Sequence, residues 1–200
     1  AATGYGDDKG IFGYGYTGSN VSLTNLVSNS GVVATDTSGV GTARSGLSAA
    51  RYGSTGQALF AYGTTGSVVS LKNLVSNSGV VAADVTGVGT ARRYVAAAGY
   101  GGDKAIFGYG YISNTTNLSN LVSNTGIVAS DTSGVGSSRY VPAAARYGGD
   151  KAIFGYGYLT GGTPTSLTNL VSNSGVVASD TTGVGTARGG LAAAEYSTSA

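Results

Sequence analysis

A segment of about 48 residues recurs four times along this chain. Arg44 and its equivalents are separated by 48, 47 and 49 residues, and Asp36 and its equivalents are separated by the same intervals. A repeat of this length forms one supersecondary unit, which buries its apolar face against neighbouring copies. We therefore expect a single repeat domain over residues 1–200, with units at approximately 5–51, 52–99, 100–146 and 147–196.

The third copy shows which elements each unit should contain. Residues 101–103 read Gly-Gly-Asp, which is a tight hairpin signal, and KAIFGYGY after them predicts a strand. The segment NLVSNTGIVAS alternates apolar and small polar residues, which predicts one strand or two short ones. The alanine run that follows has helical propensity, but it is too short for a stable helix, so we expect a strand. Each copy thus predicts about four short strands in an up-and-down meander.

Composition supports an ordered β protein and excludes several chemistries. Glycine makes up 36 of the 200 residues, well above the usual share of roughly 7%, but the chain has only two prolines and keeps regular apolar positions. Because Cys and His are absent, thiolate and imidazole metal sites, cysteine nucleophiles and Ser-His-Asp triads cannot form within one chain. Carboxylate sites for calcium remain open, but we expect no metal and no cofactor. Almost every reactive side chain is repeated, whereas an active site is usually a single cluster, so we expect no enzyme.

The low charge content bears on partners and location. Charged residues make up 10% of the chain, against an average near 25%, and the net charge is +2 without a basic run. Phosphate binding needs clustered Lys and Arg, so we expect no nucleic-acid partner. No stretch approaches the roughly 20 apolar residues that span a bilayer, so we expect no membrane insertion. A surface of Ser, Thr, Asn, Gly and Tyr suits an extracellular, cell-surface or virion protein.

The order of these motifs resembles the Kelch repeat, in which glycines close an apolar strand and an arginine follows later. The matching glycines are split by a tyrosine, and the tryptophan of the Kelch family is missing from every copy. These glycines are Gly13 and Gly15, Gly108 and Gly110, and Gly155 and Gly157. The resemblance implies a β-propeller of four Kelch-like, four-stranded blades. The string DKAIFGYG…TNLVSNSGVVA…GVGTAR is also similar to tandem repeats in proteins of uncultured marine phages and aquatic bacteria, which implies no particular activity.

An aspartate and an arginine flank a turn in every copy and can meet across it. Identical copies favour a repeated ion pair that holds the strands in place, while a carboxylate and arginine clamp for a ligand is the alternative. The expected structural ion pairs are Asp36 with Arg44, Asp84 with Arg92, Asp131 with Arg139, and Asp180 with Arg188.

The tyrosines of the FGYGY strands and the variable loops after them are the candidate ligand-binding positions. Packing between repeats is the simpler interpretation of the rings, and an exposed aromatic row that meets a glycan or another subunit is the alternative. Binding residues in a propeller lie on loops at one face of a rigid scaffold. The candidates are Tyr16, Tyr111, Tyr158, Asn20 and Asn114.

The two ends of the chain duplicate one position. A tyrosine closes the alanine-rich strand five times in only four repeats, at Tyr5, Tyr52, Tyr100, Tyr147 and Tyr196. In a closed ring, residues 189–196 would complete the unit that residues 10–16 open, and otherwise they would complete a unit of the next molecule. The second arrangement is an incomplete propeller or β-repeat array that strand exchange between chains completes as a ring or filament.

We therefore expect a non-enzymatic extracellular or virion-associated structural or adhesion protein that has itself as partner. The alternative is a carbohydrate-binding lectin with equivalent sites on or between the blades, for which the partner is a glycan.

Overall fold

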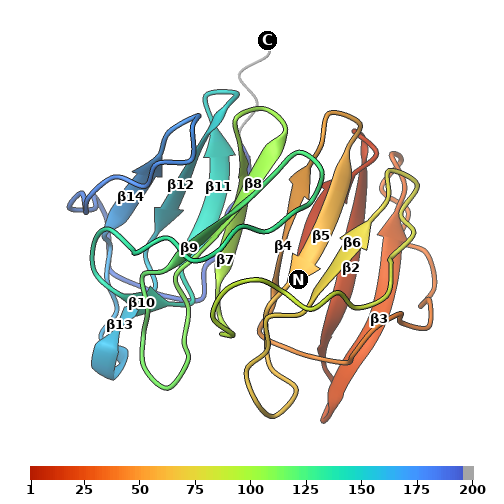
Figure 1. Ribbon diagram of the computed structural model, residues 1–200, viewed down its shortest axis with the longest axis horizontal. Helices are drawn as coiled ribbons and strands as arrows, with labels where there is room; N and C mark the ends of the chain where they lie inside the picture. Colours follow the sequence, from red (N-terminus) through yellow and green to blue (C-terminus); the bar gives the residue numbers. More distant parts are fainter. Residues whose placement is uncertain (196–200) are drawn as a thin grey trace.

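The computed structural model describes residues 1–195 (Figure 1). This part of the chain is all-β and has no α-helix, as expected. The strands are β1 (Ala2–Tyr5), β2 (Lys9–Tyr16), β3 (Asn20–Val27), β4 (Ser48–Tyr52), β5 (Gln57–Ala61), β6 (Lys72–Val75), β7 (Ala96–Tyr100), β8 (Lys104–Gly108), β9 (Ser119–Val122), β10 (Arg139–Tyr140), β11 (Ala143–Tyr147), β12 (Lys151–Gly155), β13 (Tyr158–Leu159) and β14 (Thr168–Val171). One short 3-10 turn, η1 (Thr160–Gly162), follows β13.

Twelve of these strands form four small antiparallel sheets of three strands each. We call them sheet 1 (β1-β2-β3), sheet 2 (β4-β5-β6), sheet 3 (β7-β8-β9) and sheet 4 (β11-β12-β14), and β10 pairs separately with β13. Each sheet is a meander that starts with the alanine-rich strand, which pairs with the KAIFG-type strand after a tight turn. The alanine runs are therefore strands, which confirms the sequence-based prediction.

The fourth strand expected in each unit is reduced to isolated bridges. After β3 the chain returns along it and pairs only at Thr24 with Thr37 and at Val27 with Val33. Between these two bridges the side chain of Asn25 donates to the carbonyl of Ala34, at 3.1 Å. A side-chain hydrogen bond thus holds the returning segment against β3 where the backbone ladder is incomplete. The same bond recurs at Asn73, Asn120 and Asn169.

The alanine-rich strands lie next to one another, and their order follows the chain. β1 packs on β4, β4 on β7, and β7 on β11. Within residues 1–195 no contact of similar extent joins β11 back to β1. Figure 1 shows the resulting row of sheets, with β3 of sheet 1 at one side and β14 of sheet 4 at the other. The described part of the chain is therefore an array with two ends rather than a closed ring.

The core consists of three apolar clusters, each between two neighbouring sheets. In each one a phenylalanine from the later sheet lies over the KAIFG-type strand of the earlier sheet. At Gly108 an added Cβ would lie 2.7 Å from Cζ of Phe154, so the ring occupies the space that the absent side chain leaves. Three of the four equivalent phenylalanines are completely buried, at Phe60, Phe107 and Phe154. Phe12 has no earlier sheet to pack against and is 51% exposed.

The N-terminus occupies the strand position that we expected the C-terminal segment to complete. β1 pairs with β2 from Ala2 opposite Phe12 to Tyr5 opposite Lys9, so sheet 1 is complete without residues 189–196. Residues 191–195 pair with no strand of the described part, and Tyr196 lies outside it. Of the two alternatives, the described residues do not form the one in which the chain's own C-terminal segment completes sheet 1, because β1 occupies that strand position.

Candidate functional site

The arginines that the sequence singles out are buried between sheets. Arg92 is 0% exposed, although a guanidinium is almost never buried without partners. Its Nε donates to the carbonyl of Tyr109 at 2.9 Å, its Nη2 to Oδ1 of Asn120 at 2.6 Å, and its Nη1 to the carbonyl of Thr90 at 3.0 Å. Its Nη1 also lies 3.8 Å from Oδ1 of Asp131. Arg92 belongs to the second repeat, whereas Tyr109, Asn120 and Asp131 belong to the third, so the arginine connects its own unit to the next.

The carboxylate of this network is held charged by hydrogen bonds. Burial acts to raise the pKa of Asp131, but hydrogen bonds from Thr90 and Asn120 and the charge of Arg92 outweigh it, so the pKa lies below its ordinary value. Thr90 donates through both its backbone N–H, at 3.0 Å, and its hydroxyl, at 2.6 Å. Burial lowers the pKa of Arg92, but an arginine still stays charged in a protein.

The ion pairs connect neighbouring repeats, which corrects the pairing expected from sequence. Arg44 pairs with Asp84 at 3.7 Å, Arg92 with Asp131 at 3.8 Å, and Arg139 with Asp180 at 3.7 Å. The aspartate of the same turn is not the partner, because the turn directs the arginine across the interface between sheets. This shift by one repeat leaves the first aspartate and the last arginine of the series without a neighbouring copy to pair with. Within residues 1–195, neither Asp36 of the first copy nor Arg188 of the last forms an ion pair.

The first tyrosine after the KAIFG-type segment has a left-handed backbone in every copy, which few non-glycine residues adopt. The φ angles are 60° at Tyr14, 67° at Tyr62, 63° at Tyr109 and 62° at Tyr156. In sheet 1 this residue sits at a register shift between β2 and β3. The kink turns the ring toward the neighbouring sheet. The ring of Tyr62 thus lies 4.3 Å from Cζ of Arg92 and 5.4 Å from the ring of Phe107.

The hydroxyl of Tyr109 gives a prediction for alkaline pH. The hydroxyl is buried with no hydrogen-bond partner among the described residues, and burial raises the pKa of Tyr109 to about 12. A raised folded-state pKa adds stability that is complete below the unfolded value of about 10 and is lost as the pH rises through about 12. We expect Tyr109→Phe to change the free energy of unfolding by less than about 1 kcal/mol at neutral pH, because it removes an unpaired polar group. The variant should also lose less stability than the wild type between these two pH values.

Urea unfolding followed at a series of pH values measures both effects. Tyr147→Phe is the matched control, since Tyr147 is only partly buried and has no equivalent arginine over its ring. A loss of more than about 2 kcal/mol in Tyr109→Phe at neutral pH would mean that the hydroxyl has a stabilising partner, and would contradict the prediction.

Four tyrosines that do not contact the buried arginines Arg44, Arg92 and Arg139 form one cluster beside sheets 3 and 4. Tyr140 is its centre, and its ring centroid lies 6.2 Å from that of Tyr94, 5.6 Å from that of Tyr111 and 5.5 Å from that of Tyr158. The guanidinium of Arg93 lies 4.9 Å from the ring of Tyr94. We call these five residues the tyrosine cluster. Tyr94 is 38% exposed, so part of the cluster faces solvent.

The structure brings together only two of the five candidate ligand-binding residues. Tyr111 and Tyr158 belong to the tyrosine cluster and both contact Tyr140. Tyr16 occupies the equivalent place on sheet 1, where it is 69% exposed and stands alone. The side chain of Asn20 donates to the carbonyl of Thr64, and that of Asn114 accepts from the N–H of Thr115 within its own loop. Tyr94 and Tyr140 were not among the predicted residues, because their equivalents in the other copies are not tyrosines. The triplet Arg-Tyr-Val, which occurs at residues 93–95 and 139–141, is the sequence signal that could have marked them.

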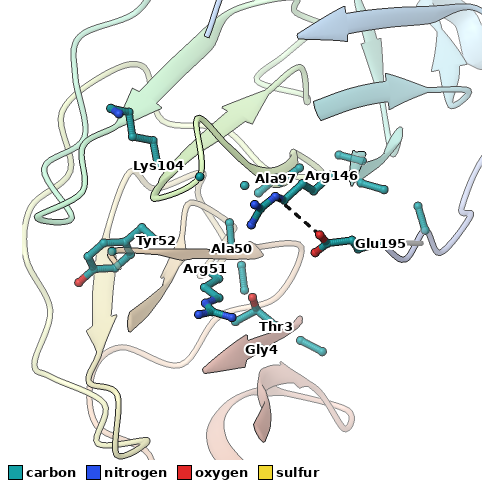
Figure 2. A pocket seen from close by; sticks show the side chains of 18 residues that line it. Thr3, Gly4, Ala50, Arg51, Tyr52, Ala97, Lys104, Arg146 and Glu195 are labelled. Carbon is teal, nitrogen blue, oxygen red and sulfur yellow. Dashed lines mark ion pairs between the residues drawn. The ribbon is translucent and has the colours of Figure 1, made fainter. Parts of the chain in front are cut away.

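A cavity of about 250 Å³ lies along the inner strands of all four sheets. Much of its lining consists of small residues, as Figure 2 shows for Thr3, Gly4, Ala50 and Ala97, and residues 193 and 195 also line it. Its charged groups already have partners. Arg51 pairs with Asp7, Lys104 with Asp103 at 3.1 Å, and Arg146 with Glu195 at 3.6 Å (Figure 2). The cavity therefore offers no unpaired charge that would recognise an ionic ligand.

Other kinds of site are not formed within residues 1–195. This part of the chain holds no group of three or more acidic, His or Cys side chains close enough to bind a metal ion. In the same part, no helix has the length and apolar character needed to cross a membrane. No protein-family model matches the chain. No curated protein compared with it shows significant similarity.

Proposed function

We propose that this chain is a non-enzymatic structural or adhesion protein of the extracellular space, a cell surface or a virion, and that it has itself as partner. We further propose that its four sheets are the blades of an incomplete Kelch-like propeller. The alanine-rich strands support this arrangement, because they lie side by side and line one cavity, as inner strands around an axis do.

One observation carries the structural role. The three internal copies of the arginine network hold their guanidinium groups 0% exposed, and the aromatic rings around them are buried as well. These groups have the chemistry that binding or catalysis would use, yet here they contact neighbouring sheets. A chain whose charged and aromatic side chains bind neighbouring units to one another is suited to form a rigid body.

Light scattering and electron microscopy of the purified chain test this proposal. We expect particles larger than the 19.5-kDa chain, and we expect their share to grow with protein concentration. Particles of single-chain size at every concentration would contradict the self-partner part of the proposal.

A carbohydrate-binding role is the second candidate, and the tyrosine cluster favours it. Tyrosine rings combine an apolar face for a sugar ring with a hydroxyl that hydrogen-bonds to it. The cluster differs from the rest of the molecule in that it is not repeated, so it would form one site rather than equivalent sites on every blade. The loops beside it also meet, since the hydroxyls of Thr115 and Thr160 lie 2.6 Å apart.

Substitution of the central ring tests this second candidate. If the cluster binds a glycan, Tyr140→Ala should weaken binding on a glycan array by about tenfold or more, since an aromatic contact contributes roughly 0.5–1.5 kcal/mol and Tyr140 holds three further rings. Tyr16→Ala is the control, because Tyr16 is an exposed ring outside the cluster, at the position equivalent to Tyr111 and Tyr158. Equal losses in both variants, or no glycan bound by the wild type, would reject the tyrosine cluster as a site.

A further inference from the structure

The two ends of the array carry complementary halves of the interface that recurs inside it. At each internal interface the earlier sheet supplies an arginine and a hydroxyl residue, and the later sheet supplies a phenylalanine, an asparagine and an aspartate. Sheet 4 has the first half without a later sheet, in Thr186 and Arg188. Sheet 1 has the second half without an earlier sheet, in Phe12, Asn25 and Asp36.

The exposure of these residues shows that both halves are unoccupied within the described part. Arg188 is exposed, whereas Arg44, Arg92 and Arg139 are 0% exposed. Val184 near it is 99% exposed, about twice as much as its equivalents Val40, Val88 and Val135, at 43%, 50% and 42%. At the other end Phe12 is 51% exposed, whereas the three equivalent rings are 0% exposed. Asp36 is exposed and accepts only from Asn25.

Residues 192–195 lie at the sheet 4 end, at the place in the repeat where an alanine-rich strand begins in the other copies. After each buried arginine the alanine-rich strand of the next sheet begins four residues later, at Ser48, Ala96 and Ala143. The same spacing from Arg188 leads to Ala192, and residues 193 and 195 line the cavity of about 250 Å³ together with residues 144–146 of β11. This segment therefore occupies the place of an inner strand, but within residues 1–195 no second strand pairs with it. An unpaired strand edge of this kind is a template for another chain.

We propose that the sheet 4 end of one molecule binds the sheet 1 end of a second copy of this chain, and that residues 192–195 replace β1 in the second copy. This inference rests on the proposed self-association and names the surfaces that carry it. Arg188 then donates to Asn25 and pairs with Asp36 of the second copy, and Phe12 of the second copy packs over Gly155 and Tyr156. The contact joins two different surfaces, so it propagates head to tail as a ring or a filament.

β1 is the strand that the incoming segment replaces. It pairs with β2 over four residue pairs, from Ala2 to Tyr5, and Ala1 extends this ladder, because the N–H of Gly13 donates to the carbonyl of Ala1 at 2.9 Å and the amino group of Ala1 donates to the carbonyl of Gly13 at 3.1 Å. The exchange therefore replaces one strand pairing by an equivalent one and frees β1 of the second copy. The contacts of Arg188 and Phe12 across the new interface favour the exchange, because both side chains are exposed in the single chain.

Charge reversal at the two ends tests the contact. Arg188→Glu and Asp36→Lys each place like charges at the interface, so we expect each variant alone to associate roughly 100-fold more weakly than the wild type in analytical ultracentrifugation. A mixture of the two should associate again, because the carboxylate introduced in one variant then faces the ammonium group introduced in the other. Both positions are exposed, so the melting temperature of each variant at low concentration should equal that of the wild type and shows that it is folded.

Two strand variants separate strand exchange from simple docking. Ala194→Pro, at the position equivalent to Thr3, removes a backbone donor from the incoming strand and should abolish association, whereas Thr3→Pro weakens the competing β1 and should strengthen it. Association that persists in Arg188→Glu, or a mixture that does not recover, would overturn the inference and leave the proposed self-association intact. Absence of association in the wild type would overturn both. A single-chain particle that Arg188→Glu destabilises strongly would show that Arg188 binds sheet 1 of its own chain, which also overturns the inference.

Discussion

Arg92→Ala should lower the free energy of unfolding by about 3–5 kcal/mol, which corresponds to a melting temperature lower by roughly 6–20 °C. The substitution leaves Asp131 partly buried without its cation, and it removes the donors to Asn120 and to the carbonyl of Tyr109. It also opens a void between sheets 2 and 3, where the guanidinium lies 4.3 Å from the ring of Tyr62. Thermal and urea unfolding measure this effect.

Arg188→Ala is the matched control for this prediction. Arg188 is the same residue at the same repeat position, and it also lies over a tyrosine ring, at 4.5 Å from that of Tyr156. Because it is exposed and forms no ion pair within residues 1–195, its removal should change the stability of the single chain by less than about 0.5 kcal/mol. Similar losses at Arg92 and Arg188 would show that burial between sheets is not what gives the arginine its importance.

Phe107→Ala is the second large effect that we expect, with a loss of about 3–5 kcal/mol in the free energy of unfolding. Phe107 is 0% exposed and lies between sheets 2 and 3, with its ring centroid 5.4 Å from that of Tyr62. Its removal leaves a cavity that the neighbouring strands cannot fill, since their own ladders hold them in place. The measurement is again urea unfolding, at a concentration low enough to keep the chains apart.

Phe12→Ala serves as the control at the equivalent position of sheet 1. Phe12 is 51% exposed, so its truncation should lower the stability of the single chain by about 1 kcal/mol or less. The same variant should weaken association between chains, because Phe12 lies in the surface proposed to bind a second copy. A stability loss at Phe12 as large as that at Phe107 would mean that Phe12 is buried within its own chain.

The local structure of this protein could be predicted from its sequence to a large extent. The tight turns and the KAIFG-type strands follow from glycine placement and apolar periodicity, and the alanine runs are strands because they are too short for helices. The fourth strand of each unit was the error. Asn25 and its equivalents hold that segment with their side chains, and apolar periodicity carries no signal for a side chain that replaces a ladder hydrogen bond.

The candidate site was harder to predict. The short separation in sequence predicted that Asp36 pairs with Arg44. Because every copy carries the same aspartate and arginine, the sequence could not distinguish this pairing from one between Arg44 and the aspartate of the next copy. The structure pairs Arg44 with Asp84, because the turn carries the arginine across to the following sheet. The tyrosine cluster was harder still to predict from the sequence. Tyr94 and Tyr140 stand at different positions of the repeat, and the packing of sheets 3 and 4 brings them together.

By itself, the sequence determined that this protein consists of repeated β units that lack the side chains for thiolate, imidazole and triad chemistry. These properties depend on composition and on short-range periodicity, which act within one repeat. Only the tertiary structure decided that the array has two ends, that each arginine binds the next unit, and which copies remain without a partner. The physical reason is that identical repeats are alike in sequence, and only their position in the array determines which of their surfaces a neighbour covers.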